Sequence, residues 1–253
     1  MKKLKSVPAE LSQVKNPPQA LYFQGDERLL QMPKVSIVGS RRATSYTKKI
    51  TTILAKKFSD IGYVIVSGAA MGVDAIAHKA ASANTIAVMA NSLDLIYPKV
   101  NEKLIKNIYD NALALSEYKP TTPATRYSFV VRNRIVVALG EFLIITQADE
   151  NSGTIRSAEI AQELGKKIYV IPHRLDESRG TQKLLRELKA ELILDIDEFV
   201  SRFGSNTKES DELLEFCKKI PSLDEALKIF NDKVYEYELE GKLEIKNLKV
   251  YPL

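Results

Sequence analysis

Two adjacent arginines follow the first buried strand that the sequence predicts. The apolar run in Lys34–Thr44 (KVSIVGSRRAT) suits a strand buried on both faces. Gly39 and Ser40 then turn the chain, and we expect a helix to begin at Arg41 and Arg42. A helix N-terminus offers free backbone N–H groups, and guanidinium groups pair with phosphate oxygens. The segment therefore predicts a phosphate-binding corner for a mononucleotide, a dinucleotide or a nucleic-acid backbone.

A glycine-containing turn follows the second predicted strand. The segment Ser67–Ala81 reads SGAAMGVDAIAHKAA, in which Gly68 and Gly72 permit a tight turn and the close approach of a ligand to the backbone. Asp74 and His78 are four positions apart on one helical face, so we expect an ion pair or hydrogen bond between them. We prefer this helix-stabilising interpretation to a catalytic dyad, because the serine of this turn lacks the G-x-S-x-G context of a nucleophile.

Arginines alternate with aromatic residues in Thr125–Arg134 (TRYSFVVRNR). Single-stranded nucleic acid is bound by cations that contact phosphates and by rings, here Tyr127 and Phe129, that stack unpaired bases. Each stacked base contributes about 1–3 kcal/mol whatever its identity. The alternative is that Phe129 is a core residue and the arginines are surface charges. For an isolated segment we would favour this alternative, but the position just after a long loop, Glu117–Ala124, makes DNA contact a competing interpretation.

A third turn, in Asp149–Glu159 (DENSGTIRSAE), precedes another predicted helix, for which Thr154 is a suitable N-cap. It predicts a second anion site at the same edge of the sheet. The segment also partly resembles the PGG-x-GT-x-x-E motif of nucleotide phosphoribohydrolases in the lysine-decarboxylase-like family. The leading Pro-Gly is absent, however, and Glu159 is displaced.

The sequence argues against a dinucleotide cofactor and a zinc site. A single glycine stands where the G-x-G-x-x-G fingerprint needs three, and the second strand ends without an acidic residue for a ribose. Two histidines and one cysteine spread along the chain do not form the usual zinc spacings. We expect no cofactor and no metal. The lone Cys217 fits a reducing cytoplasm, and no apolar run suits a transmembrane helix, so we expect a cytoplasmic protein without a membrane partner.

The elements that must position these residues alternate between strand and helix from Lys34 onward. The predicted strands are Val35–Val38, Tyr63–Ser67, Thr85–Ala90, Ala112–Ser116, Phe142–Ile145, Ile168–Ile171 and Leu192–Leu194. The predicted helices are Tyr46–Ile61, Val73–Ala83, Asn101–Asn111, Asn133–Leu139, Thr154–Leu164, Gln182–Lys189 and Ile196–Phe203. This alternation predicts an α/β fold with a doubly wound, mostly parallel sheet. Ligands bind such sheets at the carboxyl ends of the strands. All three turns described above follow predicted strands, so we expect them to lie at this edge of the sheet.

Composition predicts two domains of opposite charge. Residues 1–33 are punctuated by proline and form a lead-in with a short helix at Ala9–Gln13, and residues 34–204 form the α/β domain. Residues 205–210 are a linker. Residues 211–253 predict three helices, Asp211–Lys218, Ser222–Phe230 and Asp232–Glu240, followed by a two-stranded ribbon, an arrangement that resembles a winged helix. The chain carries 29 basic and 21 acidic residues before Ser205 but 8 and 11 from there on, so we expect a polyanion to meet the larger domain.

In order along the chain, GSRRAT, SGAAMGVDAIAH, TIAVMANSLDLIYP, LSEYKPTTPATRYSFVVRNRIV, SGTIRSAEIAQELGKKIYVIP and RGTQKLL resemble the DNA-processing protein A (DprA/Smf) family. The resemblance spans about Leu11–Leu194, and the tail resembles that family's winged-helix domain. It implies an extended Rossmann-like fold that binds single-stranded DNA, forms a homodimer, protects incoming DNA and loads the RecA recombinase in natural transformation. The DNA-binding residues that it implies are Gly39, Ser40, Arg41, Arg42, Gly68, Gly72, Arg126, Phe129, Arg132, Asn133, Arg134, Ser152, Gly153 and Thr154. Ser67 and Asp74 match the family's SG-x-x-x-G-x-D loop. Met71, Tyr127 and His173 depart from the family pattern.

The leading hypothesis is therefore a non-enzymatic single-stranded DNA-binding protein. One alternative is an enzyme that acts on nucleoside monophosphates, with Glu159 and an arginine as its catalytic pair. Another is a protein-binding scaffold, which the acidic tail favours. The third predicted tail helix, Asp232–Glu240, carries four acids and one lysine, so we expect it to contact protein rather than DNA.

Overall fold

The chain divides into two compact units, Met1–Ser205 and Asn206–Leu253. The computed structural model describes residues 1–204, 212–239 and 241–252, and the predicted linker 205–210 lies outside them. Residues 1–33 belong to the first unit, where they contribute Leu11, Leu21 and Phe23 to its core.

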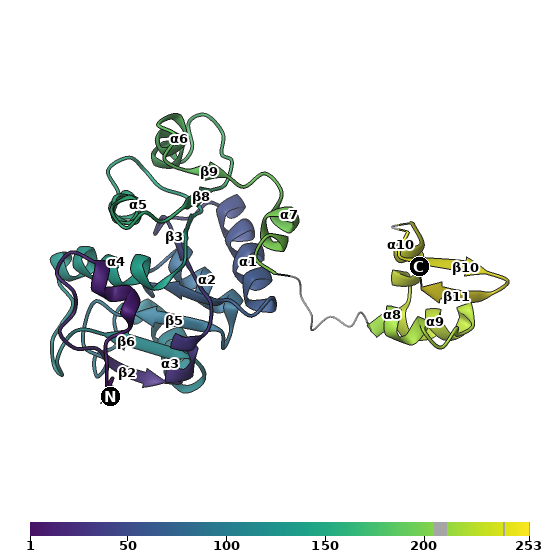
Figure 1. The fold of residues 1–253 in the computed structure, drawn as a ribbon, viewed down its shortest axis with the longest axis horizontal. Coiled ribbons are helices and arrows are strands. Elements are labelled where there is room, and N and C mark those ends of the chain that lie inside the picture. The colour runs from purple at the N-terminus through teal and green to yellow at the C-terminus, as the bar shows by residue number, and fades with distance from the viewer. Residues whose placement is uncertain (205–211, 240, 253) are drawn as a thin grey trace. The chain divides into compact units, whose positions relative to one another are not determined.

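A nine-stranded sheet runs through the first unit in the order β1-β2-β6-β5-β4-β3-β7-β8-β9 (Figure 1). The strands are β1 Lys2–Lys3, β2 Tyr22–Gly25, β3 Lys34–Val38, β4 Val64–Ser67, β5 Thr85–Val88, β6 Leu113–Ser116, β7 Leu143–Ile145, β8 Ile168–Val170 and β9 Glu191–Leu192. All strands from β3 to β9 pair in parallel, whereas β2 pairs antiparallel with β6. The predicted α/β fold with a doubly wound, mostly parallel sheet is confirmed.

Helices cover both faces of the sheet, which explains why the strands from β3 to β8 are buried along their whole length. The helices are α1 Ser45–Asp60, α2 Val73–Ala81, α3 Glu102–Asn111, α4 Arg126–Leu139, α5 Gly153–Glu163, α6 Arg179–Arg186 and α7 Ile196–Ser201, with single 3₁₀ turns η1 Ala9–Gln13, η2 Glu27–Gln31 and η3 Lys99–Asn101. Alternate residues of β4 show which helices cover each face. Val64 and Val66 belong to the core on the side of α4 and α5, while Ile65 belongs to the core on the side of α1, α2 and α7. Helix α3 lies against β5 and β6 on the α2 side.

Rings concentrate in the core beneath α1 and α7. Phe58 of α1 contacts Phe142, Phe199 and Phe203, and the Phe142 and Phe203 rings stack with their centroids 4.4 Å apart. Aromatic pairs of this kind add to the free energy gained from burial alone. They fix α1 on the sheet and so fix the turn that precedes it.

The lead-in of residues 1–33 is more ordered than an extended segment. The predicted short helix is present as η1, which packs against α4. Strand β2 was not predicted. It adds an antiparallel strand beside β6, with Phe23 opposite Leu115.

The second unit contains three helices, α8 Glu212–Cys217, α9 Leu223–Phe230 and α10 Lys233–Leu239, followed by the antiparallel hairpin of β10 Leu243–Lys246 and β11 Lys249–Pro252. This order of elements agrees with the prediction, and the winged-helix assignment stays a prediction. The unit has its own small core, made of Leu213, Cys217, Ala226, Val234, Leu243 and Val250.

Candidate nucleic-acid interface

The centre of the sheet is the point at which the chain changes direction across it. Strand β3 is flanked by β4 on one side and by β7 on the other, both parallel to it. The connections that leave β3 and β7 therefore diverge, and ligands of doubly wound sheets bind beyond the carboxyl ends of the strands at such a point. The Gly39–Thr44 turn, which follows β3, lies at this switch point.

The Gly39–Thr44 turn is held by side-chain hydrogen bonds to its own backbone. The Ser40 hydroxyl accepts from the backbone N–H of Arg42 at 3.0 Å, and Gln147 accepts from the backbone N–H of Thr44 at 3.0 Å. Arg41 and Arg42 are exposed. The prediction that α1 begins at these arginines is wrong, because Thr44 is its N-cap and accepts from the backbone N–H of Thr47. The arginines thus lie on the turn, ahead of the helix.

The second glycine turn, Gly68–Gly72, interlocks with the first. Gly72 has a φ of +80°, and a Cβ there would lie 2.3 Å from the carbonyl oxygen of Ser40. Val73, which begins α2, donates its backbone N–H to that same carbonyl at 3.1 Å. Glycine is therefore needed at position 72 for both its conformation and its contact.

Arg132 lies beneath these turns and is not free to contact solvent. The residue is 3% exposed, and its guanidinium donates to the carbonyls of Gly68 and Val88. Burial lowers the pKa of Arg132 to about 10, which leaves it charged at neutral pH. The structure thus places this candidate DNA-binding residue in a supporting position under the Gly68 turn.

Asp74 and His78 also support this turn, and the predicted bond between them is wrong. The Asp74 carboxylate accepts from the backbone N–H of Gly68, while His78 Nε2 accepts from the backbone N–H of Ala69. His78 Nδ1 then donates to Thr85 at 2.6 Å. Burial raises the pKa of Asp74, against the effect of the Arg132 charge. Burial and that same charge lower the pKa of His78 to about 3, so its imidazole is neutral.

The first turn of α4 carries the exposed part of Thr125–Arg134. The sequence predicts a helix only from Asn133, but α4 begins at Arg126 with a capping box between Thr125 and Ser128. Arg126 is exposed and Phe129 is half-buried. The guanidinium of Arg41 lies over the Phe129 ring, 5.2 Å from its centroid. Residues far apart in the sequence are thus brought together at one edge of the sheet.

The other two polar candidates on α4 are engaged within the protein. Arg134 pairs with Glu117 at 2.6 Å and also donates to the carbonyl of Asn16. Asn133 accepts from Arg132 and donates to the carbonyl of Gly153 at 3.4 Å. This last bond connects α4 to the start of α5.

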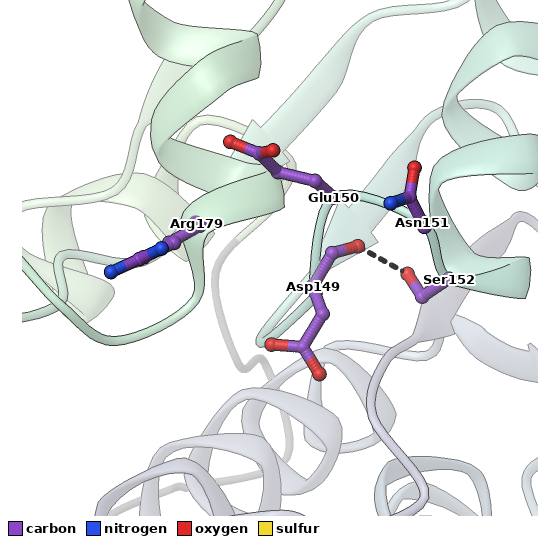
Figure 2. Close-up of a pocket in the computed structure, with 5 residues that line it drawn as sticks. All are labelled: Asp149, Glu150, Asn151, Ser152 and Arg179. Carbon is purple, nitrogen blue, oxygen red and sulfur yellow. Dashed lines mark hydrogen bonds between the residues drawn. The ribbon is translucent and has the colours of Figure 1, made fainter.

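The third turn opens α5. Its N-cap is Ser152, two positions before the predicted cap at Thr154, and its first residue is Gly153. An open depression of about 300 Å³ beside it is lined by Asp149, Glu150, Asn151, Ser152 and Arg179 (Figure 2). The Ser152 hydroxyl donates to the Asp149 carbonyl at 2.7 Å. The two carboxylates beside this helix N-terminus weaken its attraction for an anion relative to the Gly39–Thr44 turn.

Sequence reasoning missed Tyr97, which lies at the same edge of the sheet. Tyr97 follows β5, and its ring centroid is 5.8 Å from that of Phe129. Its position in a loop that follows a strand could have placed Tyr97 at this edge of the sheet. Its contact with the ring on α4 could not be predicted, because the two residues are far apart in the sequence.

The family model for DNA recombination-mediator protein A matches residues 2–204. The chain belongs to this family. The predicted resemblance to DprA/Smf proteins is thereby confirmed. Relatives include DNA processing protein DprA of Bacillus subtilis, 35% identical over 189 residues, and that of Streptococcus pneumoniae, 36% identical over 186 residues. The matched regions cover 72% and 71% of this chain but only 64% and 65% of those relatives.

Two solved structures of family members have the same fold. DNA processing protein A from Helicobacter pylori, described for its unique single-stranded DNA binding mode, superposes with a TM-score of 0.79 and 44% identity over 80% of this chain and 94% of that chain. The Streptococcus pneumoniae protein superposes with a TM-score of 0.72 and 36% identity, covering 77% of this chain and 70% of that chain. Among the residues that the structure describes, no helix is both long and apolar enough to cross a membrane.

Proposed function

We propose that this chain is a single-stranded DNA-binding protein whose phosphate-binding centre is the Gly39–Thr44 turn. The contact between Arg41 and Phe129 is the observation that carries this proposal. It places a cation and a ring side by side at the switch point of the sheet, and Arg126 lies one helical turn before Phe129. Phosphate contact and ring contact together are what binding without sequence preference requires.

The other candidate residues divide into contacts and supports. We propose that Arg41, Arg42 and Arg126 contact phosphates, with the backbone N–H groups of Gly153 and Thr154 as a weaker second anion site. Buried Arg132, together with Asp74 and the glycines at 68 and 72, holds the turns in place. Arg134 and Asn133 fix the position of α4.

The biological role that we propose follows from family membership. The protein protects incoming single-stranded DNA in the cytoplasm and loads the RecA recombinase on it during natural transformation, as a homodimer and without catalysing a reaction. The relatives named DNA processing protein DprA and the DNA-binding structure of the Helicobacter pylori protein support this role.

A nucleotide-hydrolysing enzyme fits the geometry less well. Glu159, the acid that such an enzyme requires, lies on the surface of α5 and pairs with Arg156 at 2.9 Å. A surface ion pair three positions apart in a helix is a stabilising contact of small magnitude. An assay for free base released from nucleoside monophosphates tests this alternative directly.

The proposal predicts that Arg41→Ala weakens binding to oligo(dT) and flattens its salt dependence. Loss of one phosphate contact on a single strand reduces the slope of log K against log salt by about 0.7. Fluorescence anisotropy across a salt series measures both quantities. Arg28→Ala is the matched control. Arg28, on η2, is also exposed, but it pairs with Asp26. Unchanged affinity and slope in folded Arg41→Ala protein would show that this turn is not a phosphate site.

A further inference from the structure

Phe129, the ring expected to stack a base, already has two neighbours within the protein. The guanidinium of Arg41 lies over its ring at 5.2 Å, and the ring of Tyr97 lies at 5.8 Å with an interplanar angle of 49°. The side chain is half-buried in the first turns of α4. Exposed Tyr97 therefore offers a base more ring surface than half-buried Phe129.

Tyr97 presents the open ring of this cluster. The residue is 49% exposed. The Tyr97 ring is left half in water while it contacts a second ring, Phe129, whose face carries the Arg41 guanidinium. This is the arrangement expected where an unpaired base is to be stacked.

Tyr127 is more exposed than Tyr97, at 76%, but it does not belong to this cluster. It stands two positions before Phe129 on α4, and residues two apart on a helix do not share a face. Among the described residues, the rings in contact with Phe129 are limited to that of Tyr97.

We propose that Tyr97 is a base-stacking residue of the single-stranded DNA site. This inference rests on the proposed function. The strand places a phosphate on Arg41 and the adjoining base on Tyr97, and Phe129 supports both because it contacts the guanidinium and the phenol ring. Since the contact is made through a ring face, it accepts any base.

The test compares Tyr97→Leu with Tyr97→Phe on oligo(dT) and on an abasic oligonucleotide of the same length. We expect Tyr97→Leu to weaken oligo(dT) binding about tenfold, which corresponds to about 1.4 kcal/mol and falls within the range for one stacked base. Tyr97→Phe keeps the ring and retains wild-type affinity. Neither variant changes the salt slope, and neither differs from wild type on the abasic strand, which has phosphates but no bases.

Tyr235→Leu is the matched control, because Tyr235 has a similar exposure of 43% but lies on α10 of the second unit. Equal losses for Tyr97→Leu on oligo(dT) and on the abasic strand would overturn the inference, because a purely structural change in the turn affects both. An unchanged affinity for oligo(dT) would also overturn it. If wild-type protein fails to bind oligo(dT), the proposed function itself is wrong, so the two failures are distinguishable.

A fluorescent reporter gives a second readout that does not depend on affinity. The sequence contains no tryptophan, so Tyr97→Trp introduces a single indole at the proposed stacking position. We expect saturating oligo(dT) to quench its emission and the saturating abasic strand to leave it nearly unchanged. Equal responses to the two strands would contradict base stacking at this position.

Discussion

Arg132 shows how a residue with the chemistry of a phosphate ligand becomes part of the scaffold. Its guanidinium reaches two backbone carbonyls, at Gly68 and Val88, and its charge acts on buried Asp74. Removing one member of a buried, charged group is costly, since it leaves the others without compensation. The turn that carries Gly68 therefore depends on an arginine that solvent does not reach.

Arg132→Met is expected to destabilise the protein by about 3 kcal/mol, the range found when one partner of a buried charge pair is removed. Urea unfolding followed by far-UV circular dichroism measures this loss. Arg28→Met, which removes an exposed arginine paired with Asp26, should leave the free energy of unfolding nearly unchanged. A stable Arg132→Met variant with a reduced salt slope for oligo(dT) would instead make Arg132 a phosphate ligand.

At the scale of elements, the position of the site depends on the N-terminus of α4. Thr125 accepts from the backbone N–H of Ser128 at 3.1 Å, and the Ser128 hydroxyl accepts from the backbone N–H of Thr125 at 2.8 Å. This capping box orders the first turn, which carries Arg126 and Phe129. Fraying of that turn would separate the ring from Arg41.

Thr125→Val keeps the shape of the side chain but removes the hydroxyl, so we expect a loss of stability of about 1 kcal/mol and weaker oligo(dT) binding. Thermal unfolding and anisotropy measure the two effects. Ser222→Ala is a control for the cap alone, since Ser222 forms the same box with Glu225 at the start of α9. It should lower the stability of the second unit and leave DNA affinity unchanged. Unaltered binding by Thr125→Val would show that the first turn of α4 does not position the site.

The sequence predicted elements better than it predicted contacts. Apolar runs located each strand from β3 to β8 to within two residues at either end, because strands buried on both faces are mostly apolar. The start of α4 was missed because the buried positions of its first two turns are polar, Ser128 and Arg132, so the apolar helical period is hidden. The turn at Arg41 was predicted from local residue types, whereas its contact with Phe129 depends on two segments meeting in space.

Partnerships of charged side chains were the least predictable feature. Asp74 and His78 share a helical face, yet each bonds instead to the backbone of the preceding turn. Likewise, nothing local distinguishes exposed Arg126 from buried Arg132, because burial is decided by the carbonyls that the fold places around position 132.

At the scale of the whole molecule, the two units have separate cores. The second unit packs its helices and hairpin around Leu213, Val234 and Val250, without a residue of the first unit in the cluster. Its helix α10 carries Glu236 and Glu238, both exposed. Acidic side chains repel a phosphate backbone, so we expect this unit to contact protein more than DNA.

Deleting Ser205–Leu253 should therefore leave oligo(dT) affinity within about threefold of the full chain, a change of less than about 1 kcal/mol. Anisotropy on the full and shortened chains measures the ratio, and circular dichroism shows whether the shortened chain is folded. A collapse of binding in a folded, shortened protein would place part of the DNA site in the second unit.

Strand β2 has a consequence for how the protein is made. Residues Tyr22–Gly25 leave the ribosome long before their partner, Leu113–Ser116, has been synthesised. In that interval the apolar side chains of Leu21 and Phe23 have no sheet to cover, and the strand has unpaired backbone groups. Completion of this edge is a late, long-range event in a nascent chain, and such events expose a chain to self-association. We expect spontaneous refolding to be more sensitive to protein concentration than synthesis on the ribosome, where neighbouring nascent chains are kept apart.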